Sequence, residues 1–246
     1  MLLIMEGIVY TMVLNLYNPF TQMFAKRMGG GDVHTAMINA IPPLVAIFAL
    51  LPGGMLIERL NRKKKTVLLM LAAVSVFYAS IAFVPLIPHE GKVFVFVILI
   101  GLMNCPGSLY LTTWQSYFAD NFKGSYANRV YTVRSKYSAL FGLVTVLVTG
   151  LLLNNVPTSD EERLILYQIF YGVCFLLTLL QILLFSKVKG ETELREHTSG
   201  TGNQKPAKAG MFSKEDFSGM LKNRPFLVFC LCSFVFHLSW QMAWPL

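Results

Sequence analysis

Seven long stretches of the chain contain almost no charged residues, and they dominate its pattern of hydrophobic and polar positions. They span residues 7–25, 33–57, 66–91 (interrupted by Glu90), 93–119, 137–159, 164–186 and 225–246. Because an α-helix rises about 1.5 Å per residue, about 20 residues cross a hydrocarbon core of about 30 Å. Each stretch is therefore predicted to be a transmembrane helix. A β-barrel strand would alternate apolar and polar residues over about 10 positions, which the run at 66–71 does not.

The composition agrees with a membrane environment. Of the 246 residues, 54% are hydrophobic and 14% are charged, whereas soluble proteins contain about 25% charged residues. A single water-soluble domain of this size could not bury so much apolar surface. The predicted fold class is therefore all-α: a polytopic membrane protein with a six-helix N-terminal bundle and one further transmembrane helix.

The basic residues predict the orientation of these helices. Most of the 21 Lys and Arg residues fall in the second, fourth and sixth connections, whereas the other three connections hold only Lys26, Arg27, Lys92 and Arg163. Cytoplasmic loops of membrane proteins carry an excess of basic residues. We therefore expect the N-terminus and the even-numbered connections to lie in the cytoplasm. The net charge of +8 then reflects topology, and no nucleic-acid partner is expected.

The long sixth connection divides the chain into parts. Residues 187–224 are charged and rich in Gly, Ser, Thr and Lys, which is typical of a flexible linker. The predicted domains are a transmembrane bundle at 1–186, a cytoplasmic central linker at 187–224 and a seventh helix at 225–246. Within the linker, residues 213–216 have the spacing of a helix capping box, so a short helix on the membrane surface and a plain solvated loop are both open.

A charged motif occupies the second connection. It begins at Gly54 and reads Gly-Met-Leu-Ile-Glu-Arg-Leu-Asn-Arg-Lys-Lys. Gly54 and Glu58 are four residues apart and share a helix face, so the glycine permits close helix packing while the acid sits near the helix C-terminus. An acid is unfavourable at that end of a helix unless it has a partner.

This motif resembles the signature of the major facilitator superfamily, Gly-x-Leu-x-Asp-Arg-x-Gly-Arg-Arg/Lys, which lies in the same loop of those transporters. The resemblance implies a cytoplasmic gate in which the acid binds basic residues of the next cytoplasmic loop. The gate residues implied here are Gly54, Leu56, Glu58, Arg59, Arg62, Lys63, Arg129 and Arg134. Glu58 in place of Asp and Asn61 in place of Gly depart from the signature. The alternative is that residues 62–65 only anchor the topology.

The resemblance extends over the whole chain. Six helices, a long linker and the segment 223–226 at the start of the seventh helix match the first half of a twelve-helix transporter plus one helix of the second half. It implies a secondary active transporter of a small solute that works by alternating access, at the plasma membrane. The chain would then be incomplete as given, and a truncated, transport-inactive membrane protein is the alternative. The expected partners are the lipid bilayer, a small-molecule solute and either a missing second half or another copy of the chain.

Polar residues form one-sided stripes on three of the predicted helices. Polar side chains in a membrane are costly unless they face protein or water. The stripes comprise Thr11, Asn15, Asn18 and Gln22 in the first helix, Asn104, Ser108, Thr112 and Gln115 in the fourth, and Ser233, His237, Trp240 and Gln241 in the seventh. In the superfamily these three helices line the central cavity, so we expect a pathway for an uncharged or zwitterionic solute. The alternative is that these side chains are hydrogen-bonded packing residues, worth about 0.6 kcal/mol each.

Two titratable residues bear on coupling to protons. Glu6 is the only acid near the interior of a predicted helix, and it lies opposite the polar stripe of the first helix, near the cytoplasmic end. We expect it at the membrane interface rather than in proton coupling. His237 is expected to be a hydrogen-bonded packing residue.

Other functional classes find less support. The four histidines are scattered, the Cys230 and Cys232 pair has no further candidate metal ligand nearby, and no Gly-rich phosphate loop follows a strand. We therefore expect no enzymatic activity, no metal and no cofactor. A seven-helix receptor would match the helix count alone.

Overall fold

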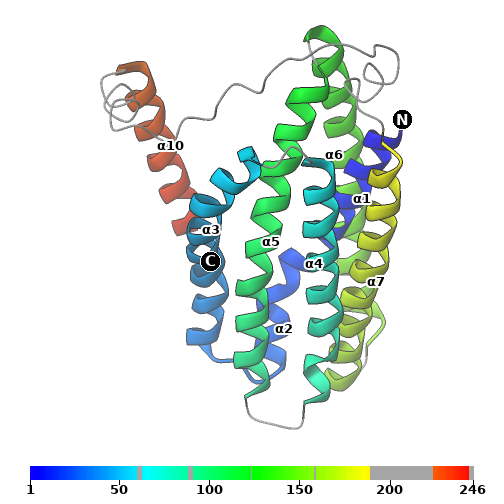
Figure 1. The fold of residues 1–246 in the computed structure, drawn as a ribbon. Helices are drawn as coiled ribbons and strands as arrows, with labels where there is room; N and C mark the ends of the chain where they lie inside the picture. Colours follow the sequence, from blue (N-terminus) through cyan, green and yellow to red (C-terminus); the bar gives the residue numbers. More distant parts are fainter. Residues whose placement is uncertain (60–62, 88–90, 123, 158, 189–223, 244–246) are drawn as a thin grey trace. The chain divides into compact units, whose positions relative to one another are not determined.

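The computed structural model describes residues 1–59, 63–87, 91–122, 124–157, 159–188 and 224–243, with the backbone alone at 51, 55–59, 237, 238 and 240–243. Every described element is helical (Figure 1). The elements are α1 (Leu2–Tyr17), η1 (Asn18–Phe20), α2 (Thr21–Arg27), α3 (Asp32–Arg59), α4 (Lys63–Phe83), η2 (Val84–Leu86), α5 (Lys92–Asn121), α6 (Gly124–Asn155), α7 (Asp160–Ser186) and α10 (Arg224–Ala243).

Five described helices are long and apolar enough to cross a membrane. They are Asp32–Leu50 in α3, Lys63–Leu86, Lys92–Asn121, Gly124–Asn155 and Asp160–Ser186. The first predicted span is divided among α1, η1 and α2, with Pro19 in the short 3-10 turn between the two α-helices. The seventh coincides with α10, whose apolar part is Arg224–Phe236. The all-α membrane class predicted from the sequence is thus confirmed.

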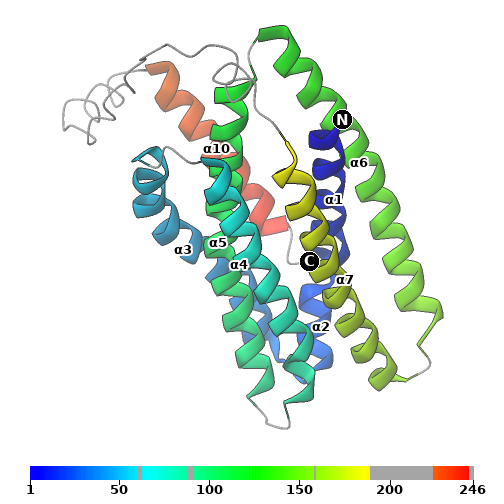
Figure 2. The ribbon, with the colours of Figure 1, turned by 45° about the vertical axis from the view of Figure 1, so that its right-hand side comes forward.

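The chain forms two units, Met1–Gly202 and Asn203–Leu246, and α10 belongs to the second. Within the first unit, α1 packs against α6 and α7, α4 packs against α5 and α7, and α3 packs against α5. Figures 1 and 2 show these helices running side by side through the bundle. The helices thus pack in the order α3, α5, α4, α7, α1 and α6. This order places α1, α4, α5 and α7 at the centre and α3 and α6 at the two ends.

Two connections are shorter than predicted. α3 continues to Arg59 and α4 begins at Lys63, so only residues 60–62 separate them. The fourth connection is largely replaced by the first turns of α6, which begins at Gly124 rather than at residue 137. Gly124 has a φ of 64°, a left-handed conformation that glycine adopts without steric cost. Because α6 begins at Gly124, Arg134 lies on a helix and not in a loop. A membrane helix can contain a cation where that cation is paired.

Ion pairs attach neighbouring helices at both ends of the bundle. Lys63, at the start of α4, donates a hydrogen bond to Ser116 Oγ at 2.7 Å and forms an ion pair with Asp120 on α5. At the other end, Arg27 Nη1 lies 2.6 Å from Asp160 Oδ1, which joins α2 to the start of α7. The Asp120 and Asp160 side chains are exposed, so each pair should contribute at most about 1 kcal/mol.

Aromatic rings fill the core between α2, α5 and α7. Phe24 is fully buried, and its ring centroid lies 5.1 Å from that of Phe96, 4.9 Å from that of Tyr167 and 5.7 Å from that of Tyr171. A second core cluster lies toward the other end of the bundle and includes Trp114 and Phe185. The region between these two clusters contains the cavity described below.

Small residues let α1 and α6 approach closely. A Cβ atom added to Gly142 would lie 2.7 Å from Asn15 Nδ2 and 2.9 Å from Thr11 Cγ2. Small residues favour close packing of membrane helices. α6 carries four of them at helical spacing, Ser138, Gly142, Thr145 and Thr149, and the contact at Gly142 is such a close approach.

Replacing Gly142 by leucine should therefore push α1 and α6 apart. Overpacking of a tight contact costs about 1–3 kcal/mol, so we expect the midpoint of thermal unfolding in detergent to fall by several degrees. Gly150→Leu, on the same helix, is the matched control, because an added Cβ there meets nothing within 4 Å. Equal midpoints for the two variants would show that the α1–α6 contact is not tight.

Candidate functional site

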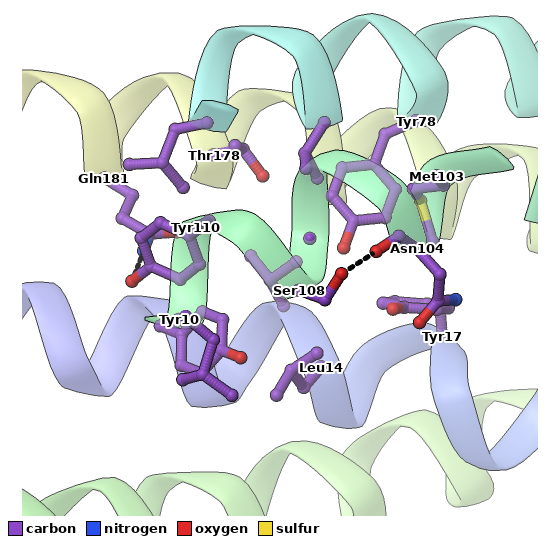
Figure 3. Close-up of a pocket in the computed structure, with 15 residues that line it drawn as sticks. Tyr10, Leu14, Tyr17, Tyr78, Met103, Asn104, Ser108, Tyr110, Thr178 and Gln181 are labelled. Carbon is purple, nitrogen blue, oxygen red and sulfur yellow. Dashed lines mark hydrogen bonds between the residues drawn. The ribbon is translucent and has the colours of Figure 1, made fainter. Parts of the chain in front are cut away.

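A cavity of about 240 Å³ lies between α1, α4, α5 and α7 (Figure 3). Four tyrosine side chains and four polar side chains contribute to its lining, and the rest of the lining is apolar. The tyrosines are Tyr10, Tyr17, Tyr78 and Tyr110, and the polar residues are Asn104, Ser108, Thr178 and Gln181. None of the described residues that line the cavity carries a charge.

The two ends of the cavity differ in their residues. Figure 3 shows Tyr110 and Gln181 together at one end, and Tyr17, Tyr78 and Asn104 at the other. At the second end the ring centroids of Tyr17 and Tyr78 are 5.3 Å apart. At the first end the same distance separates the centroids of Tyr10 and Tyr110. Pairs of tyrosine rings thus lie at both ends.

Helix backbone groups already bind the hydroxyl protons of two polar lining residues. Ser108 donates to the carbonyl oxygen of Asn104 at 2.7 Å, and Thr178 donates to that of Cys174 at 2.7 Å. The oxygen of a hydroxyl that donates its proton still has lone pairs that accept hydrogen bonds. These two hydroxyls can therefore act toward a bound molecule chiefly as acceptors.

Directly behind Tyr110 and Gln181 lies a buried carboxylate, that of Glu6. The Glu6 side chain has no exposed surface. Its Oε1 accepts a hydrogen bond from the Tyr110 hydroxyl at 2.7 Å and another from Gln181 Nε2 at 2.8 Å, and Gln181 Nε2 also lies 2.8 Å from the Tyr110 hydroxyl. Side chains from α1, α5 and α7 thus meet at one acidic group.

Arg134 on α6 supplies the compensating charge. Its Nη2 lies 3.1 Å from Glu6 Oε2, and its side chain is 12% exposed. The guanidinium carbon lies 4.1 Å from the ring centroid of Trp114, a distance typical of a cation–π contact. Close packing on Gly7, where an added Cβ would lie 2.2 Å from Arg134 Nε, fixes the arginine against α1. The result is a neutral ion pair enclosed by four helices.

This geometry adds to the sequence-based interpretation of Glu6. We predicted a residue at the membrane interface, near the cytoplasmic end, and the structure shows that its side chain is buried among four helices and paired. The physical reason is that an acid buried inside a membrane protein requires a nearby cation. Arg134 supplies it because α6 begins at Gly124, thirteen residues earlier than predicted, and packs against α1. Arg134, predicted as a partner of Glu58, binds Glu6 instead in the structure.

Of the stripe residues whose side chains the structure describes, two line the cavity, Asn104 and Ser108. Thr11 and Asn15 instead face Gly142 of α6 and bond within their own helix. This placement agrees with the alternative that they are packing residues.

The other stripe residues lie elsewhere. Gln22 Nε2 donates to Asn39 Oδ1 at 2.9 Å, which joins α2 to α3. Asn18, Thr112 and Gln115 are exposed. Ser233 lies on α10, in the second unit. The side chains of His237, Trp240 and Gln241 lie outside the described residues.

Half of the predicted gate lies outside the described side chains. This applies to Leu56, Glu58 and Arg59, and Arg62 is not described at all. Gly54 is on α3, where an added Cβ would meet none of the described atoms within 4 Å, and Arg129 is exposed on α6. Lys63 binds Ser116 and Asp120, as described above. The pairing of Glu58 with a basic residue stays a prediction.

Sequence reasoning missed the four tyrosines and Gln181 because it searched for polar stripes. Tyr10 and Tyr17 are seven residues apart and Thr178 and Gln181 are three apart, so each pair shares a helix face. The amide of Gln181 in an otherwise apolar segment was the clearest available signal. Among the described residues, no group of three or more His, Cys, Asp or Glu could hold a metal ion.

Comparison with known proteins gives one match. The model of a protein family described as Major Facilitator Superfamily matches residues 3–245. No curated protein and no solved structure matches the chain. All the described residues that line the cavity fall within the matched range.

Proposed function

Because the chain belongs to the major facilitator superfamily and is thus a membrane transporter of that type, we propose that it moves a small solute without net charge across the membrane by secondary active, alternating-access transport. The solute would bind in the tyrosine-lined cavity. The observation that carries this proposal is a cavity at the centre of the bundle whose described lining is aromatic and polar but uncharged.

The apolar surface of the bundle supports insertion in a lipid bilayer. Large apolar residues are exposed along α6, where Leu140, Leu143, Leu147 and Leu151 are each 57–60% exposed. Lipid can cover such surfaces without cost, whereas water cannot. We further propose a plasma-membrane location. On the distribution of basic residues we propose that the N-terminus and the even-numbered connections lie in the cytoplasm.

Alternating access requires that water reach the cavity from each side of the membrane in turn. In a variant without its native cysteines, Asn104→Cys should therefore react with a membrane-impermeant methanethiosulfonate added to either side of sealed, oriented vesicles. Leu102→Cys is the matched control: it lies two residues away on α5, and Leu102 is 48% exposed on a side of the helix that does not line the cavity.

We expect the reagent to label Asn104→Cys from both sides and to leave Leu102→Cys unlabelled. Labelling of Asn104→Cys from one side alone would contradict alternating access at this cavity. Equal labelling of the two variants would mean that water reaches the cavity side of α5 no better than the opposite side of the helix.

A further inference from the structure

The wall of the cavity at Tyr110 and Gln181 separates any bound solute from Glu6 by a single layer of side chains. Both residues line the cavity, and both hydrogen-bond Glu6 Oε1, at 2.7 Å and 2.8 Å. The polar groups on this wall are therefore oriented by a negative charge that the solute does not contact. A change in the net charge at Glu6 would act on the solute across this short, desolvated distance.

In the structure that charge is compensated. Among the described residues, those bonded to the carboxylate are Tyr110 from α5, Gln181 from α7 and Arg134 from α6, and Arg134 is the one cation of the three. Arg134 is held in place by the face of Trp114 and by the backbone at Gly7. A cavity that is backed by a neutral pair, and whose described lining carries no charge, offers an entering ion no counter-charge for its lost hydration.

The lining also indicates what an uncharged solute should carry. Tyrosine rings at both ends of the cavity favour a flat, apolar or aromatic body, since aromatic pairs gain energy when offset-stacked or edge to face. The hydroxyls of Ser108 and Thr178 already donate to backbone carbonyls, so they can accept a hydrogen bond from the solute. A matching solute therefore has at least one N–H or O–H donor.

We propose that the buried Glu6–Arg134 pair sets the charge selectivity of this cavity and that the cavity binds an uncharged aromatic molecule with a hydrogen-bond donor. This inference rests on the proposed function in that it takes the cavity as the solute site. Glu6 and Arg134 act through Tyr110 and Gln181 and do not touch the solute, so they are specificity-determining residues rather than contact residues.

The test measures binding of three indoles that share a ring and differ in charge: tryptophol (neutral), tryptamine (cationic) and indole-3-acetate (anionic). Binding to the purified full chain in phosphatidylcholine nanodiscs is measured by equilibrium dialysis at pH 7.5, and binding to empty nanodiscs is subtracted. No transport is required, so the result is independent of the thiol-labelling experiment above. A cavity that binds tryptophol but fails the labelling test would separate this inference from the transport proposal.

The wild-type chain should bind tryptophol about tenfold more tightly than either ion. Arg134→Gln leaves Glu6 without its cation and should raise the affinity for tryptamine relative to tryptophol about tenfold. Glu6→Gln leaves Arg134 without its anion and should raise the relative affinity for indole-3-acetate. The double variant Glu6→Gln/Arg134→Gln is again neutral and should return to the wild-type order.

Opposite shifts in the two single variants, reversed in the double variant, are a result that loss of packing would not produce. Asp120→Asn is the matched control, because it breaks the ion pair to Lys63 and does not line the cavity. It should leave all three affinities unchanged. Shifts in the same direction for both single variants would overturn the inference. If the single variants do not fold, the wild-type order decides, and binding of either ion as tightly as tryptophol overturns the inference.

Discussion

Arg134→Ala should destabilise this protein more than any other single substitution of a charged residue that the structure describes. The substitution leaves the carboxylate of Glu6 fully buried without its cation. Removal of one partner of a buried ion pair costs about 3–5 kcal/mol, because the remaining charge has lost its water and gained nothing in return. We expect a correspondingly large decrease in the free energy of unfolding in mixed micelles and a low yield of folded protein.

Two further variants separate loss of the pair from loss of a side chain. Arg129→Ala removes an arginine from the same helix, where it is exposed, and should change the stability by less than about 0.5 kcal/mol. Glu6→Gln/Arg134→Met replaces both charges and should be more stable than Arg134→Ala alone, since no uncompensated charge remains. If the double variant were the less stable of the two, packing of the arginine, and not its charge, would hold the helices together.

Phe24→Ala should have the second largest effect. The Phe24 ring is fully buried and contacts the rings of Phe96, Tyr167 and Tyr171, which join α2 to α5 and α7. Truncation of a buried phenylalanine leaves a cavity and costs about 3–5 kcal/mol in soluble proteins. Because lipid is as apolar as the core, the transfer component is weaker here, and we expect the low end of that range, about 3 kcal/mol.

Phe94→Ala is the matched control for this prediction. Phe94 lies on α5 two residues before Phe96, and it is 52% exposed. Its truncation removes the same number of atoms but leaves no cavity inside the bundle, so the free energy of unfolding should fall by less than about 1 kcal/mol. Similar losses for both variants would mean that the aromatic cluster is loosely packed.

The sequence predicted the membrane class well because length and charge determine it locally. A run such as 164–186 is too apolar to be exposed to water and is long enough to cross a bilayer, whatever its neighbours are. In the structure this run lies within α7. The resemblance of the motif that begins at Gly54 to a transporter signature is likewise local, and the match of the family model over residues 3–245 confirms the family. Boundaries were less predictable: the charge of Arg134 suggested a loop, but the residue lies inside α6.

The candidate site was only partly visible in the sequence. Asn104 and Ser108 were predicted to face a solute pathway, and both line the cavity. Thr11 and Asn15 share a helix face just as clearly, but that face is turned toward Gly142 of α6. Helical spacing shows which residues lie on one side of a helix, whereas it does not show which neighbour that side meets.

By itself, then, the sequence determined the membrane environment, the approximate helical segments and the family. The reason is that the length of an apolar run and a contiguous motif are properties of single segments. Only the tertiary structure decided where the polar groups meet. Glu6 and Arg134 are separated by more than half of the first bundle, and no local pattern relates them. Four helices pack around the carboxylate of Glu6, because an unpaired charge is costly inside a membrane protein. This packing creates both the pairing with Arg134 and the cavity wall that Tyr110 and Gln181 form in front of it.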